Sequence, residues 1–120
     1  MDLQLRIRSA ELDDERIQDS TFELRQLLNT HTDAAATLPE AVATPGSKGD
    51  PVTLGTLALA MLTSGAGVAV FKVLEAYVSR KRSIELEVSR PDGRKLVLRA
   101  QETRPEQLAA LQKTFEDFLN

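Results

Sequence analysis

Residues 52–71 read VTLGTLALAMLTSGAGVAVF, twenty consecutive positions without a charged side chain in a protein in which 28% of residues are charged. This run is long enough to span a bilayer, and the basic triplet Arg80-Lys81-Arg82 follows it as a positive-inside pattern would. Seven of the twenty residues are Gly, Ser or Thr, however, and two glycines lie in its second half. The run is therefore either a membrane-spanning helix or the core of a small folded domain.

We expect the run to form two helical segments that bend at Ser64–Gly67, because each glycine costs a helix about 1 kcal/mol relative to alanine. The first helix would begin after Asp50 and Pro51, which suit an N-cap and a first helical turn, and would cover VTLGTLALAMLT. The second would continue as an amphipathic helix to the basic triplet, whose charge suits the negative end of a helix dipole.

The residues before this run predict a strand, a helix and a second, short strand. In LQLRIR at 3–8, apolar and polar side chains alternate, which is typical of a strand with one buried face. We interpret the acidic stretch ELDDERIQD at 11–19 as a solvated turn. The S-x-x-E spacing of Ser20 and Glu23 then predicts that a helix begins there. A short edge strand is expected near Ala34–Leu38.

The segment SIELEVSRPDGRKLVLRA at 83–100 predicts a β-hairpin. Pro91, Asp92 and Gly93 suit a three-residue loop in which the glycine has a positive φ. A two-residue Asp-Gly loop would instead place apolar and charged residues opposite one another, so the three-residue loop is preferred. This loop brings three apolar pairs to one face: Val88 with Leu96, Leu86 with Leu98, and Ile84 with Ala100.

A closing helix is predicted after Thr103, since Thr103 and Glu106 repeat the capping-box spacing and Pro105 suits the first turn. We expect residues 1–120 to form a single α+β domain in the order β-α-(β)-α-α-β-β-α. Helices would cover a small mixed or antiparallel sheet made of the N-terminal strand, the hairpin and, if it forms, a fourth edge strand. The apolar stripe of the closing helix is Leu108, Leu111, Phe115 and Phe118.

This topology favours a soluble core over a membrane span. A single crossing would separate the strand at 3–8 from the hairpin, and neither half would have enough strands for a core of its own. The N-terminal residues lack the pattern of a secretory signal, and the absence of cysteine fits a reducing compartment. We therefore expect a cytoplasmic protein. The alternative is an inner-membrane protein with its C-terminus inside.

The sequence offers few groups for catalysis. Cysteine is absent and His31 is the single histidine, so we expect no catalytic residue, no cofactor and no metal site. Asp13, Asp14 and Glu15 are interpreted as a solvated acidic turn and not as a cation site. The formal charge of −3 argues against nucleic acid as a partner.

Basic residues concentrate in the second half of the chain, where residues 72–104 carry nine Lys and Arg against five Asp and Glu. Such segregation produces either one basic face or an ordinary solvated strand surface, and the second interpretation is preferred. Within this segment Arg80, Lys81 and Arg82 form the candidate surface for a partner or a membrane.

The order of these features resembles the effector-associated constant component family of bacterial conflict, or anti-phage defence, systems. The family often has Trp in the first helix where this chain has Leu27 and Leu28, and residues 31–44 form a poor strand pattern. The stretches that carry the resemblance are TFELRQLLNT, PGSKGDPVTLGTLALAMLTSGAGVAVFKVLEAYVSRKR and IELEVSRPDGRKLVLRAQE.

The resemblance implies a non-enzymatic adaptor in an NTP-dependent bacterial defence system. Its partners would be an effector protein, such as a caspase-like or trypsin-like peptidase, and a signalling NTPase. The alternative is a membrane tether anchored by a helix at 52–71 that localises such an effector. Self-association of the chain is left open, no nucleic acid is expected, and a membrane is the less favoured partner.

Overall fold

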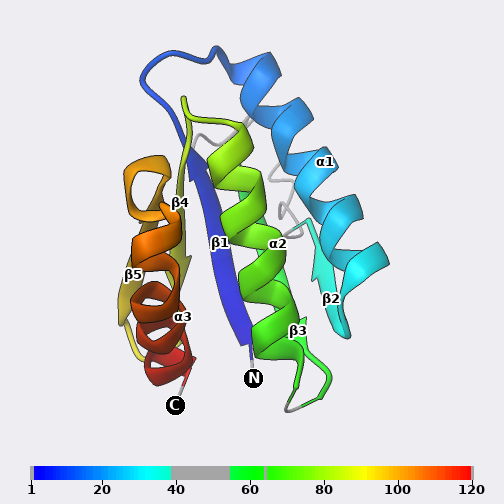
Figure 1. Ribbon diagram of the computed structural model, residues 1–120. Helices are drawn as coiled ribbons and strands as arrows, with labels where there is room; N and C mark the ends of the chain where they lie inside the picture. Colours follow the sequence, from blue (N-terminus) through cyan, green and yellow to red (C-terminus); the bar gives the residue numbers. More distant parts are fainter. Residues whose placement is uncertain (1, 39–54, 64, 120) are drawn as a thin grey trace.

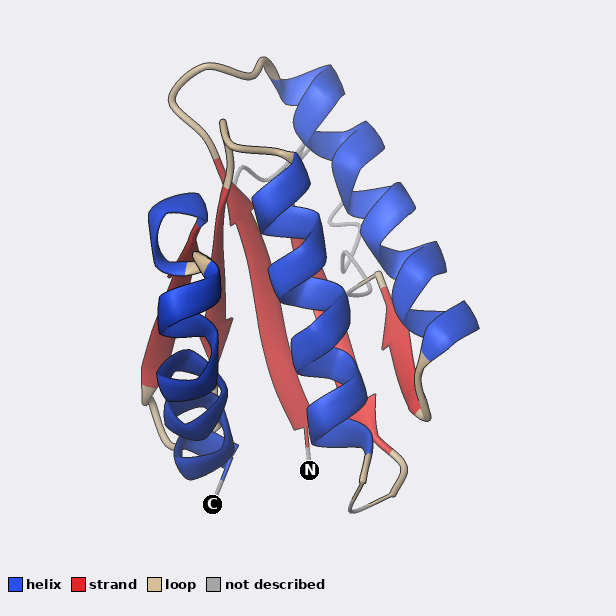
Figure 2. Ribbon diagram, viewed as in Figure 1, coloured by secondary structure: helices blue, strands red, loops and turns tan. Residues whose placement is uncertain are grey.

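The computed structural model describes residues 2–38, 55–63 and 65–119, in which helices lie on one face of a five-stranded antiparallel sheet (Figures 1 and 2). The strand order is β2-β3-β1-β4-β5, and the expected α+β class is confirmed. The elements are β1 (Asp2–Arg8), α1 (Asp14–His31), β2 (Ala34–Thr37), β3 (Thr56–Met61), α2 (Ala66–Arg80), β4 (Glu85–Ser89), β5 (Lys95–Arg99), the short 3₁₀-helix η1 (Ala100–Glu102) and α3 (Pro105–Leu119).

Strand β3 occupies the place where the sequence pattern predicted a helix, and that prediction is wrong. Leu57 and Leu59 are buried in the core, while Ala58 between them and Ala60 after them are only half-buried. β3 pairs with β1 on one side and β2 on the other, so sheet contacts override the helix preference of Leu, Ala and Met. The expected helix start at 50–51 lies outside the described residues.

The chain does turn where glycines interrupt the apolar run, because β3 ends at Met61 and α2 begins at Ala66. In the parts of the chain that the structure describes, no helix has the length and apolarity needed to cross a bilayer. The continuous helix at 52–71 that a membrane tether required does not form, since residues 56–61 are a strand. α2 crosses the middle of the sheet (Figure 1) and buries Ala66, Val70, Phe71, Leu74, Tyr77 and Val78.

Helix α1 begins within the acidic stretch that was predicted to be a turn. Asp13 is its N-cap residue, and the Asp13 Oδ1 atom accepts a hydrogen bond from the Arg16 N–H at 2.9 Å. Asp14 and Glu15 stand in the first turn, where negative charge is favourable. Ser20 is buried inside the helix, so the capping box predicted at Ser20 is wrong.

The hairpin forms in the predicted register. Val88 lies opposite Leu96 and Leu86 lies opposite Leu98, and Gly93 has a φ of 94°. The three-residue loop therefore places apolar side chains of both strands on the face that the helices cover.

The segment after the hairpin differs from the prediction in detail. Ala100, which was expected to pair with Ile84, opens η1 instead. The Thr103 hydroxyl donates to the Ala100 carbonyl oxygen at 2.8 Å and accepts from the Ser79 hydroxyl at 2.6 Å. These bonds tie the link before α3 to the end of α2. Helix α3 begins at Pro105, one residue later than a helix capped by Thr103 would begin.

The core lies between the sheet and the three helices. The Phe71 ring of α2 packs against the Phe115 ring of α3, with centroids 5.4 Å apart. The Tyr77 hydroxyl of α2 donates to the Ser20 carbonyl oxygen of α1 at 3.2 Å. The central strand β1 contributes its alternate residues Leu3, Leu5 and Ile7 to this core.

Candidate docking site

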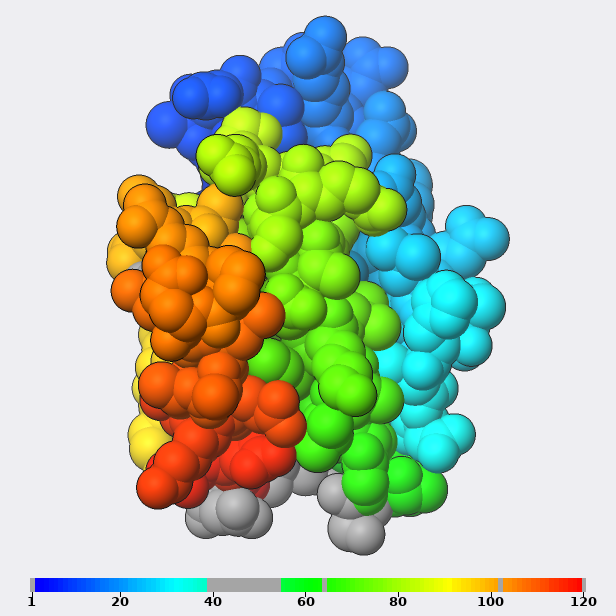
Figure 3. All heavy atoms as spheres, in the orientation of Figure 1, coloured from blue at the N-terminus to red at the C-terminus, as the bar shows by residue number. Residues whose placement is uncertain are grey.

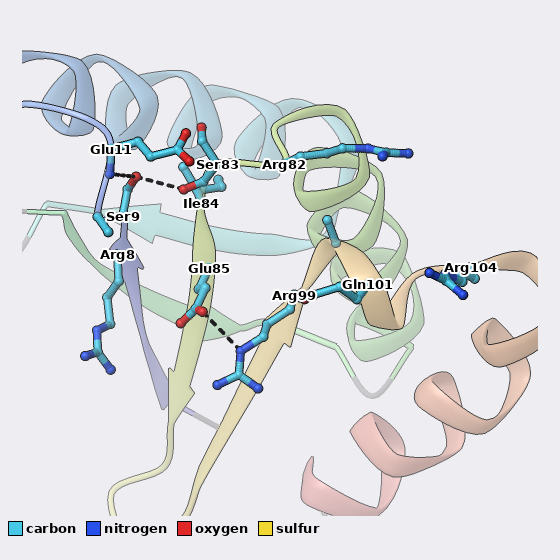
Figure 4. Close-up of a pocket in the computed structure, with 12 residues that line it drawn as sticks. Arg8, Ser9, Glu11, Arg82, Ser83, Ile84, Glu85, Arg99, Gln101 and Arg104 are labelled. Atoms are coloured by element: carbon cyan, nitrogen blue, oxygen red, sulfur yellow. Dashed lines mark hydrogen bonds and ion pairs between the residues drawn. The ribbon is translucent and has the colours of Figure 1, made fainter.

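A groove of about 680 Å³ opens at the end of the sheet where β1 ends and β4 begins (Figure 4). Its charged residues come from three stretches of the chain, 8–11, 82–85 and 99–104, and we call it the arginine groove. They are Arg8 at the end of β1, Glu11 in the link to α1, Arg82 and Glu85 around the start of β4, Arg99 at the end of β5, and Arg104 before α3.

Ser9 organises the loop that forms one wall of the arginine groove. Its hydroxyl donates to the Ser83 carbonyl oxygen at 2.7 Å, which joins the end of β1 to the residues just before β4. The Ser9 hydroxyl oxygen also accepts hydrogen bonds from the N–H groups of Glu11 and Leu12, each at 3.1 Å. The wall is therefore held by bonds between the Ser9 side chain and the backbone, which do not depend on the charged side chains.

Two arginines of the groove are already engaged in ion pairs. The Arg99 Nε atom lies 3.1 Å from Glu85 Oε1, and the Arg8 Nη1 atom lies 3.1 Å from Glu87 Oε2. In Figure 4, Arg8 points along the sheet, away from the loop that carries Arg82. Because these pairs neutralise much of the positive charge, the remaining arginines decide what the groove can bind.

Arg82 and Arg104 are exposed and have no acidic partner among the described residues. Their side chains extend on the same side of the groove, and Glu11 lies on the other side (Figure 4). A guanidinium group presents a planar fork of N–H donors that matches the two oxygens of a carboxylate. The groove therefore offers two available cations to an acidic group.

The basic triplet of the sequence is divided between two surfaces. The Arg80 Nη2 and Lys81 Nζ atoms lie 3.6 and 3.8 Å from Glu23 Oε1 on α1. Both cations also lie over the Tyr77 ring, at 5.7 and 5.6 Å from its centroid. Arg80 and Lys81 thus help to hold α2 against α1, while Arg82 lines the arginine groove.

The hairpin loop of Pro91, Asp92 and Gly93 lies at the far end of β4 and β5 from the groove (Figure 1). Asp92 Oδ1 accepts the Arg94 N–H at 3.0 Å, and Asp92 Oδ2 accepts the Arg94 Nε–H at 2.9 Å. The backbone hydrogen bond from Arg94, more than the charge of its side chain, lowers the pKa of Asp92. These contacts give the loop a structural role.

The remaining sequence candidates for ligand chemistry also have ordinary positions. His31 is exposed at the end of α1, and Asp13 and its neighbours form the start of that helix. In the described ranges 2–38, 55–63 and 65–119, no three His, Asp or Glu residues are placed to hold a metal ion.

Sequence reasoning did not identify Arg8, Arg99 and Arg104 as parts of one site. The alternating patterns of LQLRIR and KLVLR indicated that Arg8 and Arg99 project from the exposed face of their strands. The strand order β1-β4-β5 then brings them together. That order could not be read from residues separated by the whole length of the domain.

The fold is a small α+β domain with a charged groove at one end of its sheet. The family model of Effector Associated Constant Component 1 matches residues 8–116. The chain belongs to this family, which confirms the resemblance seen in the sequence and makes it an effector-associated component of conflict systems. No curated protein and no solved structure gives a significant match.

Proposed function

We propose that this protein is a cytoplasmic, non-enzymatic adaptor that docks an effector of a bacterial NTP-dependent defence system through the arginine groove. Membership of the Effector Associated Constant Component 1 family supports the association with an effector. The observation that carries the choice of surface is the pair of exposed arginines, Arg82 and Arg104, that lack an acidic partner among the described residues.

Carboxylates of the effector would pair with Arg82 and Arg104 at the rim of the groove. Exposed ion pairs contribute about 0.2–1 kcal/mol each, so these contacts govern orientation and association rate more than total affinity. Apolar and backbone contacts beside the groove must supply the rest of the binding free energy. Binding should therefore weaken as the salt concentration rises, because exposed charges are screened.

The first test is capture of the effector encoded beside the protein, starting with caspase-like and trypsin-like peptidases and then a signalling NTPase. Charge reversal at both positions, Arg82→Glu with Arg104→Glu, is expected to slow association and weaken capture at low salt. Lys113→Glu is the matched control, since Lys113 is exposed on α3 and lies outside the groove lining.

Three results would count against the proposal. Equal capture by the wild type and the double variant would remove the arginine groove from the interface. Failure of the wild type to capture any of the effectors or NTPases would remove the adaptor function. The isolated protein is also expected to turn over neither peptide nor nucleotide substrates, and a turnover that copurifies with the wild type but not with a His31→Ala variant would contradict the non-enzymatic role.

A further inference from the structure

Backbone hydrogen bonds in an antiparallel sheet alternate in direction along each strand, so one bond fixes the directions of its neighbours. The Ile7 N–H of β1 donates to the Gly55 carbonyl oxygen, just before β3, at 2.8 Å. Ile7 and every second residue of β1 therefore bond toward β3, and the residues between them bond toward β4.

The same alternation, carried through the β1–β4 and β4–β5 registers, sets the direction of the groups on β5. It turns the backbone of Leu96 toward β4 and the backbones of Lys95 and Val97 outward. The hairpin provides an independent check, because the Arg90 N–H donates to the Arg94 carbonyl oxygen at 2.8 Å. Counting along the strands from that bonded pair also turns the backbone N–H and C=O groups of Leu96 toward β4.

At the opposite edge of the sheet, the outward groups of β2 are occupied by side chains. The Ala36 N–H donates to Asn29 Oδ1 at 2.8 Å, and the Ala36 carbonyl oxygen accepts from Asn29 Nδ2 at 2.9 Å. The Ala34 N–H donates to the Thr32 hydroxyl at 3.1 Å. The end of α1 therefore caps the β2 edge and closes it to another strand.

The β5 edge has no such cap over Lys95 and Val97 in the described parts of the chain. β5 forms a lateral edge of the sheet (Figure 2), and its yellow atoms reach the margin of the molecule beside α3 (Figure 3). Lys95 is exposed and Val97 is half-buried. Outward N–H and C=O groups on an exposed strand are a template for strand addition.

We propose that the β5 edge takes up an extended segment of the effector as a sixth strand, and that this segment carries two carboxylates flanking an apolar residue at alternate positions. The inference rests on the proposed adaptor function and names the part of the effector that is bound. Lys95, Val97 and Arg99 project on the face of the sheet opposite α1, α2 and α3, so a sixth strand would place one side chain opposite each of them.

The charges of the neighbouring strands specify this pattern. On the face of the sheet opposite the helices, β4 carries the acids Glu85 and Glu87, and β5 carries the bases Lys95 and Arg99. The Lys95 Nζ atom lies 3.5 Å from Glu87 Oε1, and the Arg8 Nη1 atom lies 3.1 Å from Glu87 Oε2, so Glu87 is shared between two cations. Acids on the added strand would extend this alternation of charge. Arg99 also lines the arginine groove, so the added strand would run into it.

A second copy of the same chain fits this edge poorly. Two antiparallel β5 strands centred on Val97 would place Lys95 of each copy opposite Arg99 of the other. Like charges directly opposite one another on neighbouring strands destabilise the pairing. The charge pattern therefore favours a segment of different sequence.

The probe is a heptapeptide, TETVTET, which carries glutamate, valine and glutamate at alternate positions, and the control is TKTVTKT. Amide NMR spectra of the isotopically labelled full chain are expected to show shifts at Lys95 and Val97 with the acidic peptide, and at least about threefold weaker binding of the basic one. The proposal would be overturned if both peptides bound equally or if the shifts were confined to other elements. It would also be overturned if, without peptide, shifts at Val97 grew with protein concentration, because the edge would then pair with a second copy.

Two variants test the edge within the full chain. Val97→Pro removes an outward N–H group that makes no bond to β4, so the sheet should stay folded while the peptide binds more weakly. Lys95→Glu should abolish the preference, because each peptide would then meet one like and one opposite charge at positions 95 and 99. Thermal unfolding of each variant verifies the fold, and an unchanged preference in folded Lys95→Glu would overturn the proposal.

Effector capture separates this inference from the proposed function. If the folded Val97→Pro variant captures the effector as well as the wild type does, the adaptor function is retained and strand addition at β5 is contradicted. If the wild type captures no effector and yet binds TETVTET at Lys95 and Val97, the adaptor function is contradicted and the peptide-binding edge is retained.

Discussion

Gly55 and Ile7 meet through their backbones at the point where β3 begins. The Ile7 N–H donates to the Gly55 carbonyl oxygen at 2.8 Å, Gly55 has a φ of +76°, and a Cβ at position 55 would lie 2.7 Å from the Ile7 carbonyl oxygen. Gly55→Ala therefore combines an unfavourable backbone conformation with a clash against rigid backbone. We expect it to lower the free energy of unfolding by about 2–3 kcal/mol, measured by chemical denaturation.

Gly93 provides the control for this prediction. It also has a positive φ, 94°, but a Cβ there would meet no atom within 4 Å. Gly93→Ala should lose only the conformational part, about 1 kcal/mol. Equal losses in the two variants would mean that the clash with the Ile7 carbonyl oxygen adds nothing to the loss of stability in Gly55→Ala.

Arg90 holds the end of α3 against the hairpin. Its Nη1 atom donates to the Phe118 carbonyl oxygen at 2.6 Å, and its buried Nε atom lies 3.6 Å from Asp92 Oδ2, beyond hydrogen-bond reach. Arg90→Met should release the last turn of α3 and cost about 1–3 kcal/mol, because a charge-assisted bond is lost. Hydrogen exchange of the α3 amides should accelerate, whereas Arg94→Met, on the exposed side of the same loop, should leave them unchanged.

The assignment of β3 as a strand predicts an alternating response to charge. Leu59 is 1% exposed and faces the helices, so Leu59→Asp buries an unpaired carboxylate and should unfold the domain. Ala58 lies on the other face and is half-buried, so Ala58→Asp should cost much less. Circular dichroism with thermal unfolding measures both variants. Equal losses would contradict the strand and favour a helical run.

Burial raises the pKa of Tyr77 above its ordinary value of 10.0, and a contact with the Ser20 side chain opposes this shift in part. The phenol stays neutral in the folded state at a pH where the unfolded chain already ionises. The ionisation of Tyr77 should therefore not change the free energy of unfolding below pH 10, and that free energy should fall as the pH rises through the folded-state pKa.

Tyr77→Phe separates this effect from packing. The variant loses the hydrogen bond to Ser20, which costs about 1 kcal/mol at neutral pH. Its stability should then fall less steeply than that of the wild type above pH 10. Parallel stability curves in that range would show that Tyr77 does not govern the alkaline transition.

Patterns that depend on neighbouring residues predicted much of this fold. The alternation of residues 3–8 predicted β1, and the turn residues at 91–93 predicted both the hairpin and its register. β3 was missed because Leu, Ala and Met favour helices, and a six-residue apolar run gives too few repeats to distinguish the two periods. Pairing with β1 and β2, which lie elsewhere in the chain, makes this segment a strand.

The start of α1 and the arginine groove show two further limits of local patterns. Asp13 is as good an N-cap as Ser20, and the acidic residues after it were a usable signal for a helix start that was interpreted as a turn. The groove combines Arg8 with Arg82 and Arg104, which lie far from it in sequence. Only strand order places them together, so the sequence identified Arg82 alone as a candidate.

The position of β1 at the centre of the sheet has a consequence for synthesis of the chain on the ribosome. β1 is made before both of its partners, β3 and β4. A growing chain must therefore carry Leu3, Leu5 and Ile7 without their final neighbours until residues 85–89 have emerged. Exposed apolar strands of this kind are where aggregation of nascent chains begins and where chaperones bind.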